Sequence, residues 1–266
     1  ARQEAATAVL RAVQGCAAGH QARLLGQALA AVAPFLPAGQ VPAALAEARR
    51  MAVPRTWSGR PEGNALTALA RRLPQEAVRQ ELAAAGTIRD LHQRAQTLSA
   101  LAVRLAELGH GQEALSAVRP IEPLTYQVDA LLALAPHLSL PWPREALDVA
   151  GELGRHGAPV AARMAVRLAE LGETEEGWQA ALGIVGERWQ AEAMVGLAPH
   201  LPPERRGAAY ARALDVARGL SNAGQRLGVL AGIAGRLPGE LRIAALRAAL
   251  GAAVELKEVS AGAPRR

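Results

Sequence analysis

The heptapeptide VRLAELG at Val103–Gly109 occurs a second time, 63 residues later, at Val166–Gly172. Two more exact matches run in the same order. These are LAPHL, at Leu134–Leu138 and Leu197–Leu201, and ALDVA, at Ala146–Ala150 and Ala213–Ala217. Repeated phrases at a nearly fixed spacing indicate a chain made of repeated structural units. The sequence therefore predicts a double unit of about 65 residues.

Each double unit divides again, because one degenerate pattern recurs along the chain: an apolar residue, alanine, any residue, a basic residue and leucine. It begins at Leu69, Leu101, Leu134, Met164, Leu197 and Ile233, with a weaker copy at Val32. A spacing of about 33 residues has room for two helices and their turns. Prolines and glycines follow each copy as helix stop signals, and no stretch alternates apolar and polar residues as a strand does.

We therefore expect an all-α chain, an α-solenoid of about seven stacked helical hairpins. It would form a single domain over residues 1–266, with an N-terminal helix or cap at 1–19, hairpins over 20–256 and a tail at 257–266. The first helix is expected at Arg2–Gln14. One hairpin cannot cover its own apolar face, so its stability must come from packing against its neighbours.

The composition excludes several classes of site. Cys16 is the only cysteine among 266 residues, which rules out an internal disulfide, an iron–sulfur cluster and a multi-cysteine zinc site. Lys257 is the only lysine, and its surroundings fit neither a phosphate-binding loop nor a Schiff-base enzyme. Cys16 and His20 are four residues apart but have no third ligand nearby. We expect no enzymatic activity and no catalytic, cofactor-binding or metal-binding residue.

The start of the sequence and its apolar runs indicate where in the cell the protein lies. Residues 1–20 contain no signal-peptide apolar region, and charged or amide residues interrupt every apolar run before it reaches the length of a membrane span. We therefore expect a cytoplasmic protein that does not enter a membrane. The chain starts at Ala1 and not at Met, which leaves open a place within a longer protein, with this array as its regulatory part.

Two kinds of helical repeat resemble this pattern. Pro34, Pro136 and Pro199, late in the first helix of their units, resemble the proline of HEAT repeats, while the period and the LAELG…EAL phrase are similar to tetratricopeptide repeats. The LAPHLP phrase most resembles the degenerate helical arrays found beside NTPase or effector modules in bacterial signalling and defence proteins. The resemblance covers roughly residues 20–256. It implies an array that senses or docks a partner, and it carries no catalytic or ligand residue onto this chain.

The repeat places a basic residue at one equivalent position in six units: Arg72, Arg104, His137, Arg167, His200 and Arg236. Stacked units would align these residues in a column that could contact a phosphate backbone or an acidic peptide. The alternative is structural, since a cation in the last turn of a helix stabilises the helix dipole. An acid follows at the start of each second helix, so the two charges would neutralise each other across the turn.

A second candidate surface is the longest interruption between helices. Its sequence VPRTWSGRPE carries Arg55, Trp57 and Arg60 between two prolines, and a tryptophan flanked by arginines is a common interface anchor. Trp142 occupies a similar turn. The alternative is that each indole folds back over the neighbouring hairpin.

We expect a non-enzymatic scaffold or sensor that binds a protein or peptide, because helical arrays need no chemical motif to function. The alternative is a basic solenoid that binds nucleic acid, suggested by the excess of arginine in a chain of net charge +6. The charge is uneven: residues 1–72 carry +6, residues 73–204 carry −7 and residues 205–266 carry +7. An acidic middle argues against a continuous phosphate-binding stripe. The oligomeric state stays open.

Overall fold

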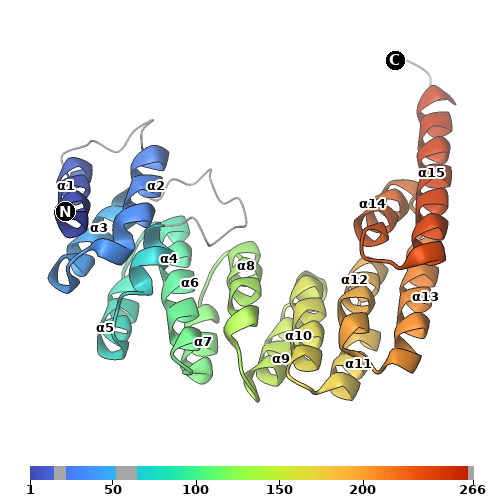
Figure 1. Cartoon of the computed structure of the whole chain (residues 1–266), viewed down its shortest axis with the longest axis horizontal. Coiled ribbons are helices and arrows are strands. Elements are labelled where there is room, and N and C mark those ends of the chain that lie inside the picture. Colours follow the sequence, from blue (N-terminus) through green and yellow to red (C-terminus); the bar gives the residue numbers. More distant parts are fainter. Residues whose placement is uncertain (15–21, 52–64, 263–266) are drawn as a thin grey trace. The chain divides into compact units, whose positions relative to one another are not determined.

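In a computed structural model, residues 1–14, 22–51 and 65–262 are described. Over these residues all regular structure is helical, which confirms the expected all-α class. Residues Ala1–Trp142 and Pro143–Arg266 form two compact units, called unit 1 and unit 2 (Figure 1).

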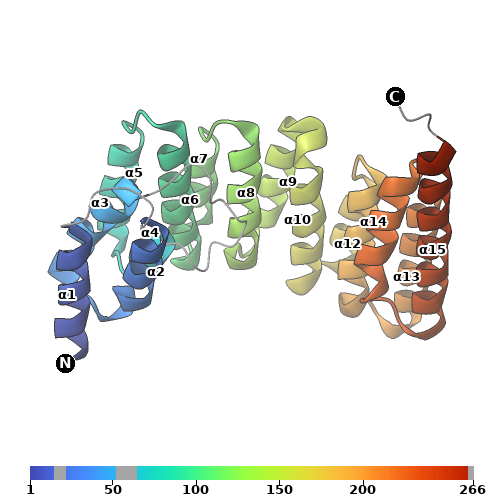
Figure 2. The same ribbon diagram turned by 90° about the horizontal axis from the view of Figure 1, so that it is seen from above.

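Unit 1 begins with the helix expected at Arg2–Gln14. Its helices are α1 (Arg2–Gln14), α2 (Ala22–Val32), α3 (Val41–Met51), α4 (Ala65–Ala70), α5 (Gln75–Ala85), α6 (Leu91–Glu107), α7 (Gly111–Val118) and α8 (Leu124–Leu134). The main packing contacts join helices one or two places apart: α2 contacts α4, α4 contacts α6, and α6 contacts α5, α7 and α8. Figure 2 shows α6 beside α8.

Unit 2 follows the same plan. α9 (Trp142–Glu152) begins with the last residue of unit 1, and the rest are α10 (Ala158–Glu170), α11 (Thr174–Leu182), α12 (Glu187–Leu197), α13 (Pro203–Gly219), α14 (Ala223–Ala234) and α15 (Gly239–Gly262). Helices α10, α12 and α14 contact one another in order, and each also packs against the helix that follows it. Alanines make up much of the core, and small side chains let helix axes approach closely.

The repeated phrase VRLAELG forms the end of a helix in both units. At Gly109 the chain turns to a φ of 85°, and at Gly172 to 96°, a conformation that favours glycine. The His110 N–H then donates to the Leu105 carbonyl at 2.9 Å and the Gly109 N–H to that of Ala106 at 3.0 Å. This bonding pattern is a Schellman motif. The phrase therefore repeats because it encodes a buried helix face followed by its stop.

The three repeated prolines lie past the end of an α-helix and not within it as expected. Pro34, Pro136 and Pro199 lie in short 3-10 helices, Ala33–Phe35, Ala135–His137 and Ala198–His200, which directly follow α2, α8 and α12. Proline has no N–H to continue the α-helical bonding, and its ring clashes with the preceding turn. Each proline therefore ends the α-helix and fixes the tighter turn that follows it.

Among the described residues, no helix has both the length and the apolar character needed to cross a membrane.

Candidate functional site: a groove in unit 1

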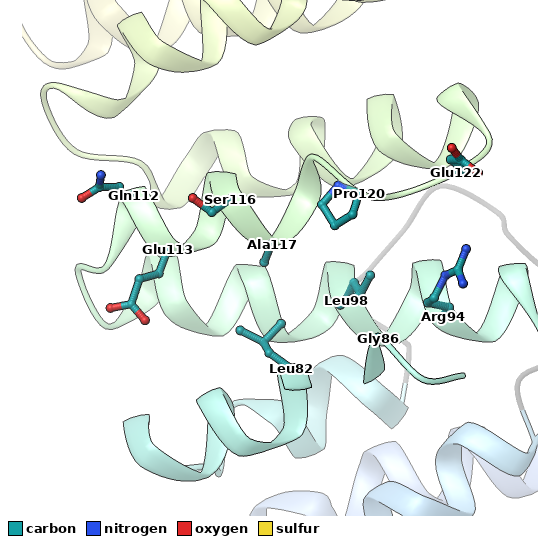
Figure 3. A pocket seen from close by; sticks show the side chains of 10 residues that line it. All are labelled: Leu82, Gly86, Arg94, Leu98, Gln112, Glu113, Ser116, Ala117, Pro120 and Glu122. Carbon is teal, nitrogen blue, oxygen red and sulfur yellow. The ribbon is translucent and has the colours of Figure 1, made fainter. Parts of the chain in front are cut away.

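Unit 1 has an open groove of about 780 Å³ between α5 and α7, which we call the α5–α7 groove. Helix α6 lies beneath it, and the segment after α7 closes one end (Figure 3). Its lining residues come from four consecutive segments: Leu82, Gly86, Arg94, Leu98, Gln112, Glu113, Ser116, Ala117, Pro120 and Glu122. A cavity of this size is within the range of ordinary ligand sites.

The middle of the α5–α7 groove is apolar. Leu82 of α5 and Ala117 of α7 are half-buried and line its two sides, and Leu98 of α6 is 5% exposed at its base. Figure 3 shows these three side chains between the polar ends. Gly86 caps the end of α5 without a side chain, which keeps this part of the groove open.

One end of the groove carries a fixed acid. Glu113, in the first turn of α7, accepts two hydrogen bonds from Arg79 of α5, from Nε at 2.8 Å and from Nη2 at 2.6 Å. This bidentate geometry holds the carboxylate in one orientation. The hydrogen bonds from Arg79 lower the pKa of Glu113, with the nearby charge of Arg79 acting in the same direction. The Glu113 carboxylate is therefore charged and already satisfied at neutral pH.

The other end of the groove carries both signs of charge. Arg94, half-buried on α6, and Glu122, exposed after α7, lie together at this end in Figure 3. No side-chain hydrogen bond or ion pair joins either residue to another described residue. A guanidinium and a carboxylate at one end can engage a ligand that brings both an acceptor and a donor.

The polar side chains that line the groove are charged, amide and hydroxyl groups. Ser116 is the one hydroxyl among the ten lining residues, and no histidine or cysteine lies among them. Nucleophilic catalysis by a hydroxyl requires a positioned base to activate it. Among the residues that the structure describes, no group of three or more His, Cys, Asp or Glu side chains could hold a metal ion.

None of the residues of the expected basic column lines this groove. Two of them, Arg72 and Arg104, instead bind main-chain carbonyls of a segment 31 to 39 residues earlier in the chain. Arg72 donates to the carbonyls of Ala33 at 3.3 Å, Leu36 at 3.2 Å and Pro34, beyond the end of α2. Arg104, at the matching position, donates from Nε to the Leu73 carbonyl at 3.2 Å. These carbonyls belong to helix ends and turns, where intrahelical partners run out.

The other four column residues have different surroundings. Arg167, in the last turn of α10, pairs with Glu170 at 2.9 Å, and His137 is half-buried after α8. His200 and Arg236 are exposed, with no ion pair or side-chain hydrogen bond to any described residue. The six positions therefore do not share one set of contacts, although the sequence pattern makes them equivalent.

The acids at the start of each second helix do not neutralise the column across the turn as expected. Three acids in these first turns, Glu113, Glu175 and Glu176, pair instead with arginines of a neighbouring second helix. In unit 1, Glu113 binds Arg79. In unit 2, Glu176 of α11 accepts from Arg144 of α9, at 2.8 Å from Nε and 2.7 Å from Nη2, and Glu175 accepts from Arg205 of α13 at 2.7 Å. The helix packing sets these partners, and they are 30 to 34 residues apart.

The acids of unit 2 make its stability depend on pH. Hydrogen bonds from Arg144 and Arg205 lower the pKa values of Glu176 and Glu175. For Glu170, burial raises the pKa, and hydrogen bonds from Arg163 and Arg167 outweigh it to give a net lowering. A carboxyl whose folded pKa lies below its unfolded value stabilises the fold above the unfolded value of about 4.3 and loses that contribution as pH falls through the folded pKa.

We expect the Glu176→Gln variant to be less stable than the parent at pH 7 and to approach it at pH 3. The substitution removes the charge that binds Arg144, and acid removes the same charge from the parent. Urea denaturation of both proteins at several pH values between 3 and 7 measures this. A stability difference that stays constant over the whole range would contradict the role of this ion pair.

Trp142 and the residues of the long interruption complete the expected surface. Trp142 is half-buried, and its indole lies against the backbone of Gly111, where an added Cβ would overlap the ring. The indole therefore packs over the start of α7, in agreement with the alternative that it folds back over a neighbouring hairpin. Arg55, Trp57 and Arg60 lie outside the described residues, as do Cys16 and His20.

A buried polar network joins α6 to α8 and was not expected from the sequence. His92, 6% exposed, contacts the Tyr126 hydroxyl through Nδ1 at 3.0 Å and the Gln96 amide nitrogen through Nε2 at 2.9 Å. The spacing of four between His92 and Gln96 was a visible signal, since such residues share a helix face. Buried polar groups require partners, and this network gives α6 and α8 a defined relative position.

Comparison of the chain with protein-family models, with curated proteins and with solved structures gives no match in any of the three.

Proposed function

We propose that this chain is an α-solenoid of HEAT- or TPR-like helical hairpins that binds a protein or peptide partner and catalyses no reaction. The observation that carries the proposal is the α5–α7 groove, with its apolar middle and charged ends. Helical arrays commonly use grooves between successive units to hold extended or helical segments of a partner.

The packing in each unit supports the repeat part of the proposal. Main helix contacts join elements one or two places apart. Side-chain hydrogen bonds recur at sequence separations near the 33-residue period. The separation is 39 residues for Arg72 to Ala33, 31 for Arg104 to Leu73, 34 for Arg79 to Glu113 and 32 for Arg144 to Glu176. In a repeat protein each repeat contacts only its neighbours, so hydrogen bonds at this separation are expected.

The chemistry of the groove suggests what its ligand carries. An apolar side chain would occupy the middle, against Leu82, Leu98 and Ala117. An acidic group would bind Arg94, because that guanidinium has no carboxylate partner among the described residues. Glu113 already binds Arg79 and offers less to a cation. We therefore propose a peptide segment with an apolar residue followed or preceded by an acid.

Selection of a displayed random peptide library against the full chain tests this function. We expect enriched peptides to combine an apolar residue with an acidic one, and to bind the Ala117→Trp variant about tenfold more weakly in a calorimetric titration. The indole would occupy the apolar middle of the groove. Leu98 and the other core leucines stay untouched, so the variant keeps the fold.

The matched control is Ala84→Trp, which adds the same side chain at an exposed position of α5 that does not line the groove. This control should bind the selected peptides within about twofold of the parent. The proposal is wrong if no peptide is enriched, or if both tryptophan variants bind the enriched peptides as the parent does.

Nucleic-acid binding is the second candidate, and the arginine bonding weakens it. Arg72 and Arg104 donate to main-chain carbonyls, and Arg79, Arg144 and Arg205 bind carboxylates. An arginine engaged in this way must break its bonds before it can contact a phosphate. Titration of labelled duplex and single-stranded probes over a range of salt concentrations tests this candidate, since phosphate contacts make affinity fall steeply with salt.

A further inference from the structure

Helix α15 leaves an apolar stripe uncovered. Ile243 is 51% exposed, Leu246 52%, Leu250 67% and Val254 49%. Their spacing of three, four and four residues puts them on one helical face. The other face packs against α14 and α13 (Figure 1) through buried alanines: Ala245, Ala249 and Ala252. Residues 243–254 contain one charged residue, Arg247, so the stripe is unusually apolar for a surface.

Helix α13 provides an internal comparison for α15. Early in each helix an arginine donates from Nε to the carbonyl five residues before it, Arg206 to Leu201 at 2.8 Å and Arg242 to Leu237 at 3.0 Å. These matching bonds align the two helices with an offset of 36 residues.

With this offset, the face of α13 that corresponds to the α15 stripe can be identified, and it is covered by other helices. Leu246 and Leu250 of α15 correspond to Tyr210 and Leu214 of α13. Leu214 is 2% exposed, and Tyr210 packs against the core cluster that α13 shares with α14 and α15. In α13 this face is therefore the one that receives the following helices. The stripe on α15 continues the same interface.

The polarity of α1 argues against head-to-tail stacking, in which α1 of one copy would cover α15 of another. Helix α1, in unit 1, exposes charged and amide side chains at Arg2, Gln3, Glu4 and Arg11. Stacking α1 of one copy on α15 of another would place these groups on an apolar stripe, and burial of unpaired charges is costly. Pairing of α15 with its own counterpart buries apolar surface on both sides.

The stripe is also self-complementary. Leu246 and Val254 lie four residues either side of Leu250, and Ile243 and Lys257 lie seven residues either side. When two such helices pack antiparallel about a two-fold axis at Leu250, Leu250 meets its counterpart and Leu246 meets Val254. Ile243 then meets the methylene stem of Lys257. Contacts of this reciprocal kind are typical of symmetric dimers.

We propose that the α15 stripe is an interface between two copies of this chain, which meet through antiparallel α15 helices. The stripe is about 16 Å long from Ile243 to Val254. A contact of that length and one helix wide is smaller than the roughly 800 Å² per partner of a standard stable complex. The dimer is therefore reversible, with a dissociation constant in the micromolar range.

Sedimentation equilibrium of the full chain tests the dimer. We expect a concentration-dependent shift from monomer to dimer between about 1 and 300 μM, and at least tenfold weaker association for Leu250→Arg. The matched control is Val185→Arg, at a 75% exposed residue outside α15, which should leave association unchanged. Monomer at all concentrations, or equal association of the parent and Leu250→Arg, would overturn the proposal.

Disulfide trapping tests the two-fold axis. With the single native cysteine removed by Cys16→Ser, we expect Leu250→Cys to form a covalent dimer in the presence of diamide, because the two thiols meet at the axis. Val185→Cys should cross-link no faster than random collision allows. Dimerisation in sedimentation without selective cross-linking at 250 would mean that the copies meet through another surface, and the proposal would then be wrong.

Discussion

The Gly157→Ala variant is expected to lose about 3 kcal/mol of unfolding free energy in unit 2. Gly157 immediately precedes α10, and a Cβ built on it overlaps the backbone carbonyl of Ala150 in α9. Its φ of −79° is open to any residue, so the conflict comes from space alone. Because the obstacle is main chain, no side-chain rotation can relieve it, and α9 and α10 must move apart.

Chemical denaturation with circular dichroism measures this loss. The control is Gly151→Ala in α9, where nothing lies within 4 Å of the added Cβ. That change should be neutral or stabilise the unit by about 0.5 kcal/mol, since alanine favours a helix more than glycine does. If the two variants unfold alike, α9 and α10 do not pack as closely as described.

The Leu105→Ala variant is expected to destabilise unit 1 by about 3 kcal/mol. Leu105 is the first of the two leucines of VRLAELG and is fully buried in α6. Truncating it removes apolar contacts and leaves a cavity that the surrounding helices fill only in part. Leu168, at the matching position in unit 2, is also fully buried, so Leu168→Ala should cost unit 2 a similar amount.

Leu108→Ala is the control for Leu105→Ala. Leu108 belongs to the same phrase but is half-exposed at the helix end, so its truncation should cost about 1 kcal/mol. Denaturation of the three proteins under one set of conditions compares these costs. Equal losses for Leu105→Ala and Leu108→Ala would contradict the burial pattern that makes the phrase recur.

Some parts of this structure follow from local sequence and others do not. The helix at Arg2–Gln14 and the stop after VRLAELG depend on nearby residues, and both were predictable. The partner of Glu113 was not, because Arg79 reaches it only through the offset at which α5 and α7 pack against α6. Pro34 was expected within an α-helix but lies in a 3-10 helix after it. The cause is also local, because proline has no N–H to continue the α-helical hydrogen bonds.

The α5–α7 groove had no sequence signal. Leu82 and Leu98 are ordinary residues of amphipathic helices, and similar leucines elsewhere are fully covered. Whether such a residue lines a groove depends on how far apart the neighbouring helices lie, which is a property of packing and not of one segment. The basic column was visible because it repeats, yet its arginines at 72 and 104 bind the main chain.

The bonds from Arg72 and Arg104 to carbonyl groups have a consequence for how such a chain evolves. A carbonyl is present at every residue, so the acceptor survives any substitution in the turn that supplies it. A duplicated segment that carries the arginine would find an acceptor beside whichever segment it joined. The sequences of the turns are then free to diverge while the segments stay attached. The attachment between such segments would therefore not depend on which side chains the turn carries.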